Sequence, residues 1–527
     1  MRRNRGIDGT QMERNSVIRV GALVLVGASA ALGTPGSARA DEPAIIRAIA
    51  EFIRTSDTER RSQLVRAIEQ DPAYERAKVS GWLHRAELFA PHPPGRMQLD
   101  VPLRPGALNP PEAGGGPATS RAITLRIPQG YDHRKPWPLI YVLHGAGGSA
   151  DRILGYYEQI LGRAVEEHII AAPTGYGDLV IHQREWPPAD EHPAVWRKIK
   201  QTVHVDSDRV FVSGYSLGGH TTWTLSVLYT DQFAGAMPLA STFTLLLPDH
   251  LWESFLPNLQ HLPLLGVWGV NDIHYGGERI SPQGGIAGVN RALRELLAGR
   301  GRPATMIELP DKGHADVRPP ADELQKLLAR RRAHWPQTVR HTFRHVCQGA
   351  AYWLEPHVWA GEQWDARQRT VRFLKGETPE SEADFAKATA RTYRALLGEV
   401  RGEVRRAGGS PASAPGTAAT AAQPSGARDS SRSPAAANEI SFDRKRISVL
   451  TVWLGDGMLA WEQPVILKAG GRVVFEGQVK PDLYVCLSQA ARTWDFDRLR
   501  WAGLRFDSRS RTHVVDAATE FPDPFAP

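Results

Sequence analysis

The sequence of 527 residues contains only two cysteines, Cys347 and Cys486. So few cysteines exclude a fold that depends on a dense disulfide framework. Because the chain has no Cys-x-x-Cys pair, we predict no metal site, and no motif calls for a cofactor. The sequence leaves the state of the two cysteines open. They either pair with each other in an oxidising compartment or remain two separate buried thiols.

Long apolar runs are also scarce. The run Val20–Leu32 has thirteen residues, too few to cross a bilayer comfortably. It follows two arginines and precedes Ala38-Arg39-Ala40, which is the order of basic region, apolar region and cleavage site in an export signal. We therefore predict that residues 1–40 are a signal peptide, starting at Met1 or Met12. The mature protein is then secreted or periplasmic, without stable membrane insertion.

The chain has little excess charge of either sign once this segment is set aside. The formal net charge is +7, but residues 1–40 hold six arginines against two acidic residues, which leaves only +3 for the rest. A domain without a concentrated basic surface has no electrostatic footprint for nucleic acid. We expect no nucleic-acid partner.

The strongest positive signal is Gly214-Tyr-Ser-Leu-Gly218, a Gly-x-Ser-x-Gly sequence. The apolar stretch 209–213 before it suits a buried strand, and 217–228 after it suits a helix. A serine at so sharp a turn has a strained backbone, and the two glycines remove Cβ atoms that would collide there. The turn exposes the hydroxyl beside the first N–H groups of the helix. We predict that Ser216 is a nucleophile.

Strands and helices alternate around this motif. The predicted strands are 122–127, 138–144, 169–173, 209–213, 234–239, 263–269 and 305–309, and the predicted helices between them are 151–168, 193–203, 217–228 and 285–298. This alternation predicts a parallel sheet that is covered by helices on both faces.

Two titratable side chains follow the last two of these strands. Asp272 and His314 both come just after a strand end, which is where open α/β sheets bind their ligands. A serine hydroxyl needs a base, and the base needs a carboxylate that fixes its tautomer. We assign these roles to His314 and Asp272, in the chain order Ser216, Asp272, His314. Asp311 and Asp316 remain rival acids because they lie close to His314 in sequence.

The turn after the strand 138–144 reads His144-Gly-Ala-Gly-Gly148. A glycine-rich turn lets the backbone approach a reacting carbonyl closely. The N–H groups of Ala146 and Leu217 are therefore the predicted oxyanion hole. We expect His144 to support this turn, and His220 to pack against the core rather than react.

Five stretches resemble the α/β-hydrolase superfamily, and within it the secreted esterase branch of feruloyl esterases, polyhydroxybutyrate depolymerases and related carboxylesterases. They are Pro128–Tyr131, Trp137–Gly148, Asp208–Gly219, Gly269–Asp272 and Gly313-His314. The resemblance implies an α/β-hydrolase fold and a serine hydrolase that cleaves a small-molecule or polymer-linked carboxylic ester through an acyl-enzyme. The sequence departs from the depolymerases at Ala146, where they carry a cysteine, but a backbone N–H does not depend on that side chain.

The rest of the chain is predicted to form accessory parts. The expected order is a helical leader and Pro/Gly-rich connection at 41–117, the α/β-hydrolase catalytic domain at 118–335, a strand and helical segment at 336–406, a disordered Ala/Ser/Pro/Gly linker at 407–439, and a C-terminal β-rich accessory domain at 440–527. We expect the leader to pack on the hydrolase core. The accessory domain is a candidate for carbohydrate or cell-surface contact.

Two alternatives to an esterase remain open. One is a serine peptidase of the prolyl-oligopeptidase type, although only about 80 residues precede the hydrolase strands and no blade-like repeat is present. The other is a non-catalytic surface binding protein on a hydrolase scaffold, although all three residue types of the triad are intact.

Overall fold

The computed structural model describes residues 42–102, 120–174, 191–243, 252–273, 285–361, 371–407, 437–517 and 519. The predicted signal peptide and nearly all of the predicted linker lie outside these ranges. Within them, no helix combines the length and the apolar character needed to cross a membrane.

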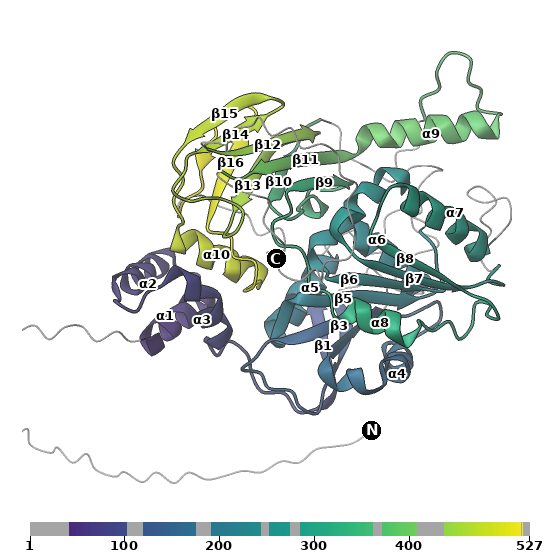
Figure 1. Cartoon of the computed structure of the whole chain (residues 1–527), viewed down its shortest axis with the longest axis horizontal. Helices are drawn as coiled ribbons and strands as arrows, with labels where there is room; N and C mark the ends of the chain where they lie inside the picture. Colours follow the sequence, from purple (N-terminus) through teal and green to yellow (C-terminus); the bar gives the residue numbers. More distant parts are fainter. Residues whose placement is uncertain are drawn as a thin grey trace, which may run out of the picture. The chain divides into compact units, whose positions relative to one another are not determined.

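An eight-stranded sheet forms the first half of the described chain (Figure 1). Its strands are β1 Gly95–Pro102, β2 Ser120–Ile127, β3 Trp137–Leu143, β4 Ile169–Pro173, β5 Val205–Tyr215, β6 Gly235–Leu239, β7 Leu264–Gly269 and β8 Ala304–Leu309. They lie in the order β1-β2-β4-β3-β5-β6-β7-β8. β2 pairs antiparallel with β1 and β4, and the other neighbours are parallel.

Helices cover both faces of this sheet. They are α4 Ala150–Leu161, α5 Glu191–Thr202, α6 Leu217–Leu228, α7 Gly285–Gly299 and α8 Ala321–Leu328. Every residue of β3 is buried, and alternate side chains enter different cores. Leu139 and Tyr141 pack with α5, α6 and α7, whereas Ile140 and Val142 pack with α4 and α8. This architecture confirms the predicted fold class.

Strand β1 lies within the segment 41–117, which the sequence interpretation described only as a helical leader and a Pro/Gly-rich connection. The segment Gly95–Pro102 pairs with all of β2 along one edge of the sheet. Of its residues only Val101 is buried. Met97, Leu99 and Val101 alternate with Arg96, Gln98 and Asp100, and Met97 and Leu99 pack partly buried on the core. This period-two pattern is the signal of a half-buried strand, and an interpretation based on the prolines and glycines overlooks it.

Two further sheets form the C-terminal β-rich region. One has the order β15-β14-β12-β11-β9 and the other β10-β13-β16-β17, and a single apolar cluster lies between them. The strands are β9 Thr338–Phe343, β10 Leu354–Trp359, β11 Gly398–Arg405, β12 Asn438–Lys445, β13 Ile447–Leu454, β14 Val465–Ala469, β15 Arg472–Gly477, β16 Ala502–Asp507 and β17 His513–Val514. Strands from both sides of the predicted linker therefore share one sheet.

The sequence predicts a strand and a helical segment at 336–406, with the helix at about 379–405, and only the first part of that range is helical. Helix α9 spans Glu382–Leu396, and β11 begins after one intervening residue. Val400 and Val404 are buried in β11 while Arg401 and Arg405 are exposed. A spacing of four residues satisfies both a helix face and a strand face, so the pattern could not separate the two.

The leader consists of α1 Glu42–Arg54, α2 Thr58–Gln70 and α3 Val79–Arg85. These helices pack on α10, Leu483–Thr493, of the C-terminal region (Figure 1). The leader was expected to pack on the hydrolase core, and it does contact that core at His204, through His84 and Phe89, but its main apolar partner is α10. Amphipathic faces show that a helix needs a partner but not which partner it has. Short 3-10 helices complete the described elements: η1 Arg76–Lys78, η2 Gly162–Glu167, η3 Thr230–Gln232, η4 Trp252–Ser254, η5 Leu256–His261 and η6 Val346–Gln348.

The two cysteines are separate thiols in this fold. Cys486 is fully buried between α10 and the leader, and burial raises the pKa of its thiol well above the usual range. Cys347 lies elsewhere, in η6.

A chain of hydrogen bonds joins the leader, the main sheet and the C-terminal region. His204 Nδ1 contacts the carbonyl oxygen of His133 at 2.9 Å and therefore donates to it, which leaves Nε2 as an acceptor. His84 Nδ1 lies 3.0 Å from that Nε2 and must donate. His84 Nε2 lies 3.0 Å from Asp497 Oδ1, which can only accept. His84 consequently carries both protons and is an imidazolium.

The charge of His84 is stabilised by this arrangement. Burial alone would lower the pKa of His84, but the hydrogen bond and the charge of Asp497 outweigh burial and raise it. The stabilising contribution is therefore complete below the unfolded pKa of about 6.5 and is lost as pH rises through the higher folded pKa.

We expect His84→Gln to destabilise the protein more in acid than in base. The loss in the free energy of unfolding is about 1–3 kcal/mol near pH 5.5, the usual range for a hydrogen bond to a charged group, and smaller near pH 8.5. Urea unfolding of both proteins at the two pH values measures it. The exposed His513, changed to glutamine, is the control and should shift neither midpoint. An equal loss at both pH values would contradict the imidazolium.

Candidate active site

Ser216 stands at the junction of β5 and α6. Its backbone has φ 56° and ψ −118°, a conformation that a non-glycine residue adopts only under strain. The two flanking glycines make this junction sterically feasible. A Cβ on Gly214 would lie 2.3 Å from the carbonyl oxygen of Gly218, and one on Gly218 would lie 2.1 Å from that of Leu143. The turn brings the backbones of β3, β5 and α6 into direct contact.

The structure brings the three predicted triad residues together. Ser216 Oγ lies 2.8 Å from His314 Nε2, and His314 Nδ1 lies 2.9 Å from Asp272 Oδ2. Asp272 is 0% exposed, whereas the His314 side chain keeps 21% of its surface. A carboxylate only accepts, so His314 Nδ1 carries the proton and Nε2 is left to accept from the serine hydroxyl.

The two rival acids lie at the surface, and Asp316 contacts other groups. Asp316 pairs with Lys312 at 3.1 Å and with Arg318 at 2.7 Å, and these hydrogen bonds, the one from Lys312 above all, lower the pKa of its exposed carboxyl. Asp311 is exposed. Asp272 is the carboxylate in contact with the imidazole.

Two tyrosines hold the loop that carries His314, and the sequence interpretation assigned them no such role. The hydroxyl of Tyr215 donates to the carbonyl oxygen of His314, and that of Tyr156 donates to the carbonyl oxygen of Val317. The two rings pack edge to face, with centroids 5.2 Å apart. Burial raises the pKa of both phenols, so both remain donors at neutral pH. Tyr215 lies within the elbow motif, which was the one available signal.

A cavity of about 690 Å³ opens beside Ser216. Ala146, Leu217 and His314 are among its lining residues. Leu217 is the first residue of α6, and the first N–H groups of a helix have no partner within it. Ala146 lies in the turn in which the Gly148 N–H donates to the Gly145 carbonyl at 3.0 Å. Both residues assigned to the oxyanion hole thus border the same space as the serine.

The two neighbouring histidines have structural contacts. His144 Nδ1 lies 2.9 Å from the carbonyl oxygen of Gly145, in the predicted oxyanion turn. His220 Nδ1 lies 2.7 Å from the carbonyl oxygen of Thr242. Burial lowers the pKa of His220 to about 4, so it is neutral at pH 7.

One group among the described residues has the spacing of metal ligands: Asp206, Asp208 and Asp497. Arg209 lies 2.6 Å from Asp206, and Arg332 lies 3.1 Å from Asp208. The third carboxylate, Asp497, contacts His84 at 3.0 Å, so each member already has a basic partner and we assign the cluster no metal.

Comparisons with known proteins find distant similarities to part of the chain. No family model matches the sequence. The chain is 25% identical over 130 residues to a probable feruloyl esterase C of Aspergillus niger, and 25% identical over 143 residues to endo-1,4-beta-xylanase Y of Acetivibrio thermocellus. These matches cover 23% and 24% of this chain, and 46% and 13% of the two relatives, so the chain spans less than half of either.

Solved structures match a larger share of the chain. A thermostable esterase covers 41% of it with 18% identity and a TM-score of 0.32, over 60% of its own length. A ferulic acid esterase covers 45% with 16% identity and a TM-score of 0.31, over 96% of its own length. The α/β architecture follows from the strand order and the covering helices of the chain itself, and this α/β core holds Ser216, Asp272 and His314.

Proposed function

We propose that this protein is a serine hydrolase that cleaves carboxylic esters with Ser216, His314 and Asp272. The observation that carries the proposal is the continuous hydrogen-bond chain from Ser216 Oγ through the imidazole to the buried carboxylate of Asp272. The strained backbone of Ser216 supports it, because such strain persists where the surrounding structure imposes it for function. The resemblance to esterases supports the choice of an ester over other acyl compounds.

In the first half of the reaction Ser216 Oγ attacks the ester carbonyl carbon. Its proton passes to His314 Nε2, and Asp272 stabilises the resulting imidazolium. The N–H groups of Leu217 and Ala146 hold the negative oxygen of the tetrahedral intermediate. When the intermediate collapses, the bond to the alcohol oxygen breaks and His314 returns the proton to that oxygen. The alcohol leaves, and the acyl group remains on Ser216.

Water completes the cycle by the same route. His314 takes a proton from a water molecule as the water oxygen attacks the acyl carbon. Collapse of this second intermediate breaks the bond to Ser216 Oγ, which recovers its proton from His314. The products are a free acid and the unchanged enzyme, and no step needs a cofactor.

Labelling with a fluorophosphonate tests the proposal. The reagent phosphonylates serines that an adjacent base activates, so we expect one label on the native protein, and peptide mapping places it on Ser216. The same protein in urea is the control, because unfolding separates the serine from His314 and should abolish the reaction. A folded protein without label would overturn the proposal.

A substrate panel then separates the reaction classes. Short-chain p-nitrophenyl esters and feruloyl esters should be cleaved faster than a proline-containing dipeptide amide, since an amide leaving group is poorer than an alkoxide or phenoxide. The reverse order would favour the peptidase alternative. A folded protein that neither labels nor hydrolyses any of these compounds would favour a non-catalytic binding protein.

We also propose a secreted or periplasmic location, on the basis of the signal-like residues 1–40. The C-terminal β-rich region is proposed to contact carbohydrate or a cell surface. Binding of the purified protein to insoluble polysaccharide, measured by co-sedimentation, tests that contact.

A further inference from the structure

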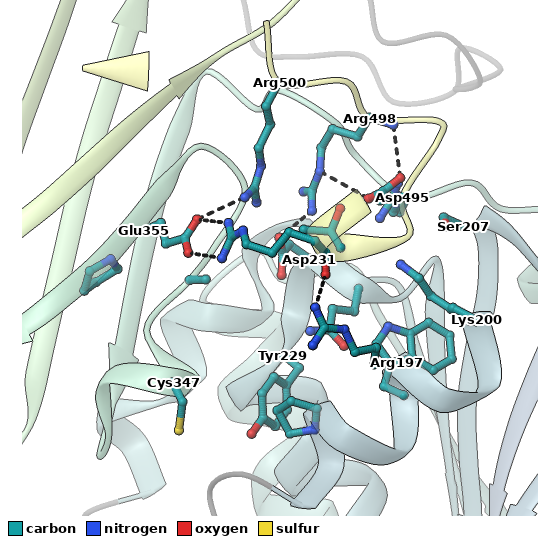
Figure 2. A pocket seen from close by; sticks show the side chains of 18 of the residues that line it. Arg197, Lys200, Ser207, Tyr229, Asp231, Cys347, Glu355, Asp495, Arg498 and Arg500 are labelled. Atoms are coloured by element: carbon teal, nitrogen blue, oxygen red, sulfur yellow. Dashed lines mark hydrogen bonds and ion pairs between the residues drawn. The ribbon is translucent and has the colours of Figure 1, made fainter. Parts of the chain in front are cut away.

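A second cavity lies away from Ser216, where the hydrolase core meets the C-terminal region. Its volume is about 260 Å³. Helix α5 lines it on one side, and β10 and the chain after α10 line it on the other. Figure 2 shows Arg197 and Lys200 reaching it from α5, and Arg498 and Arg500 from the opposite side. No step of the proposed ester hydrolysis uses these residues.

Basic side chains outnumber acidic ones in this lining. Six are basic and three are acidic: Arg197, Lys200, Arg332, Arg492, Arg498 and Arg500 against Asp231, Glu355 and Asp495. His357 also lines the cavity, but burial lowers its pKa to about 4 and leaves it neutral. Asp208, outside the cavity, binds Arg332 at 3.1 Å and offsets one charge. Among the described residues that line the cavity, basic side chains therefore remain in excess of acidic ones.

The three acidic side chains of the lining are too few to pair one for one with the six basic side chains. Glu355 accepts from Arg492 at 2.7 Å and from Arg500 at 3.0 Å, so one carboxylate serves two guanidinium groups. Asp231 Oδ2 accepts from Arg498 Nη2 at 2.7 Å. These bonds fix the guanidinium groups in place but do not neutralise them one for one.

Two side chains that are more than nine-tenths buried keep unused polar atoms at this cavity. Arg498 is 6% exposed, and its Nη1 and Nε make no hydrogen bond to the described residues, although Nε forms a long ion pair with Asp495 at 3.9 Å. Ser207 is 2% exposed, and its Oγ is likewise without such a partner. Buried donors are nearly always satisfied, and a donor left over at a cavity wall indicates a group that belongs in the cavity.

The surroundings of Lys200 also indicate that a negatively charged group belongs in the cavity. It is 5% exposed, and burial lowers the pKa of its ammonium to about 8, which the carboxylate of Asp495 offsets only in part. Arg332 and Arg498 lower this pKa further by repulsion. An anion bound in the cavity would supply the negative charge that the surroundings of Lys200 lack.

We propose that this cavity, bordered by Lys200, Ser207 and Arg498, binds the phosphate or carboxylate group of a small molecule. Guanidinium groups held in a fixed orientation suit such oxygens, because they donate two parallel hydrogen bonds to them. The bound anion joins α5 of the hydrolase core to the chain after α10, and so stabilises the contact between these two parts. The proposal does not depend on the ester hydrolysis proposed above.

Titration calorimetry on the full chain tests it, with sodium phosphate and sodium oxalate as probes. Saturable binding of either probe supports the proposal, and the tighter of the two identifies the group. At a concentration about 100 times the dissociation constant, the melting temperature should rise by about 2 °C or more. Sodium chloride at matched ionic strength should not reproduce the rise, since buried charges are screened little.

Lys200→Met is the decisive variant. It removes a charged donor that burial already disfavours, so the free protein should remain as stable as the wild type or become more stable. Its affinity for the probe should fall at least about tenfold, the usual worth of one charged hydrogen bond. Ser207→Ala should also weaken binding without loss of stability. Lys326→Met on the exposed face of α8 is the matched control and should bind as the wild type does.

Three results would overturn the proposal. They are no saturable binding of either probe, a melting shift that chloride reproduces, and an affinity that Lys200→Met leaves unchanged. In each case the basic side chains that line the cavity serve only to join the hydrolase core to the C-terminal region. Fluorophosphonate labelling of the same preparation would still report on Ser216, so failure here and failure of the proposed hydrolysis are distinguishable.

Discussion

Replacement of Asp272 by asparagine should lower kcat/KM for an ester by about 10⁴-fold, the order seen when a triad carboxylate becomes an amide. Asp272 accepts from His314 Nδ1 at 2.9 Å, which fixes the proton on that nitrogen. An asparagine can instead donate its amide N–H to Nδ1. The proton then moves to Nε2, and the imidazole can no longer accept from Ser216. Initial rates with a p-nitrophenyl ester, together with circular dichroism to verify folding, measure the effect.

Asp316→Asn is the matched control for this change. Asp316 follows His314 by two residues, but its carboxylate pairs with Lys312 and Arg318 at the surface. Loss of exposed ion pairs changes stability little, so we expect the rate to stay within about twofold of the wild type. If Asp316→Asn lost as much activity as Asp272→Asn, or if Asp272→Asn kept full activity, the assignment of the acid would be wrong.

The sequence predicts well those elements whose pattern is contained within a few neighbouring residues. A parallel strand covered on both faces is a continuous apolar run, and β3, β4 and β7 are fully buried as such runs require. The carboxyl ends of parallel strands meet at one edge, which is why Asp272 and His314 could be placed beside Ser216 without coordinates.

The parts that the sequence does not predict depend on pairing between distant segments. The burial of Val400 and Val404 suits a helix as well as a strand, and only pairing of β11 with β9 and β12 decides between them. The packing of the leader on α10 is also a contact between distant segments. The sequence does not predict it, because the apolar faces of the leader helices would fit any apolar surface. The cavity lined by Lys200 and Arg498 is formed by α5, β10 and the chain after α10. Because these segments are far apart in sequence, no local motif indicates a binding role for either residue.

A methyl group on Gly218 should be among the most damaging small changes in this protein. Its Cβ would lie 2.1 Å from the carbonyl oxygen and 2.4 Å from the carbonyl carbon of Leu143, which are backbone atoms of the central strand β3. Neither the strand nor the first turn of α6 can move without breaking its neighbours' hydrogen bonds. We expect Gly218→Ala to lower the free energy of unfolding by about 3 kcal/mol or more, as severe overpacking does. Urea unfolding measures it.

Gly155→Ala separates steric conflict from the general effect of replacing a glycine. Gly155 lies inside α4, and an added Cβ there would meet nothing within 4 Å. Alanine is the better helix former, so this variant should gain about 0.5–1 kcal/mol. Opposite signs for the same chemical change would show that close approach of β3 and α6 sets the requirement at Gly218. Equal stability of Gly218→Ala and the wild type would mean that the elbow can relax, and the strain at Ser216 would then not be imposed by its neighbours.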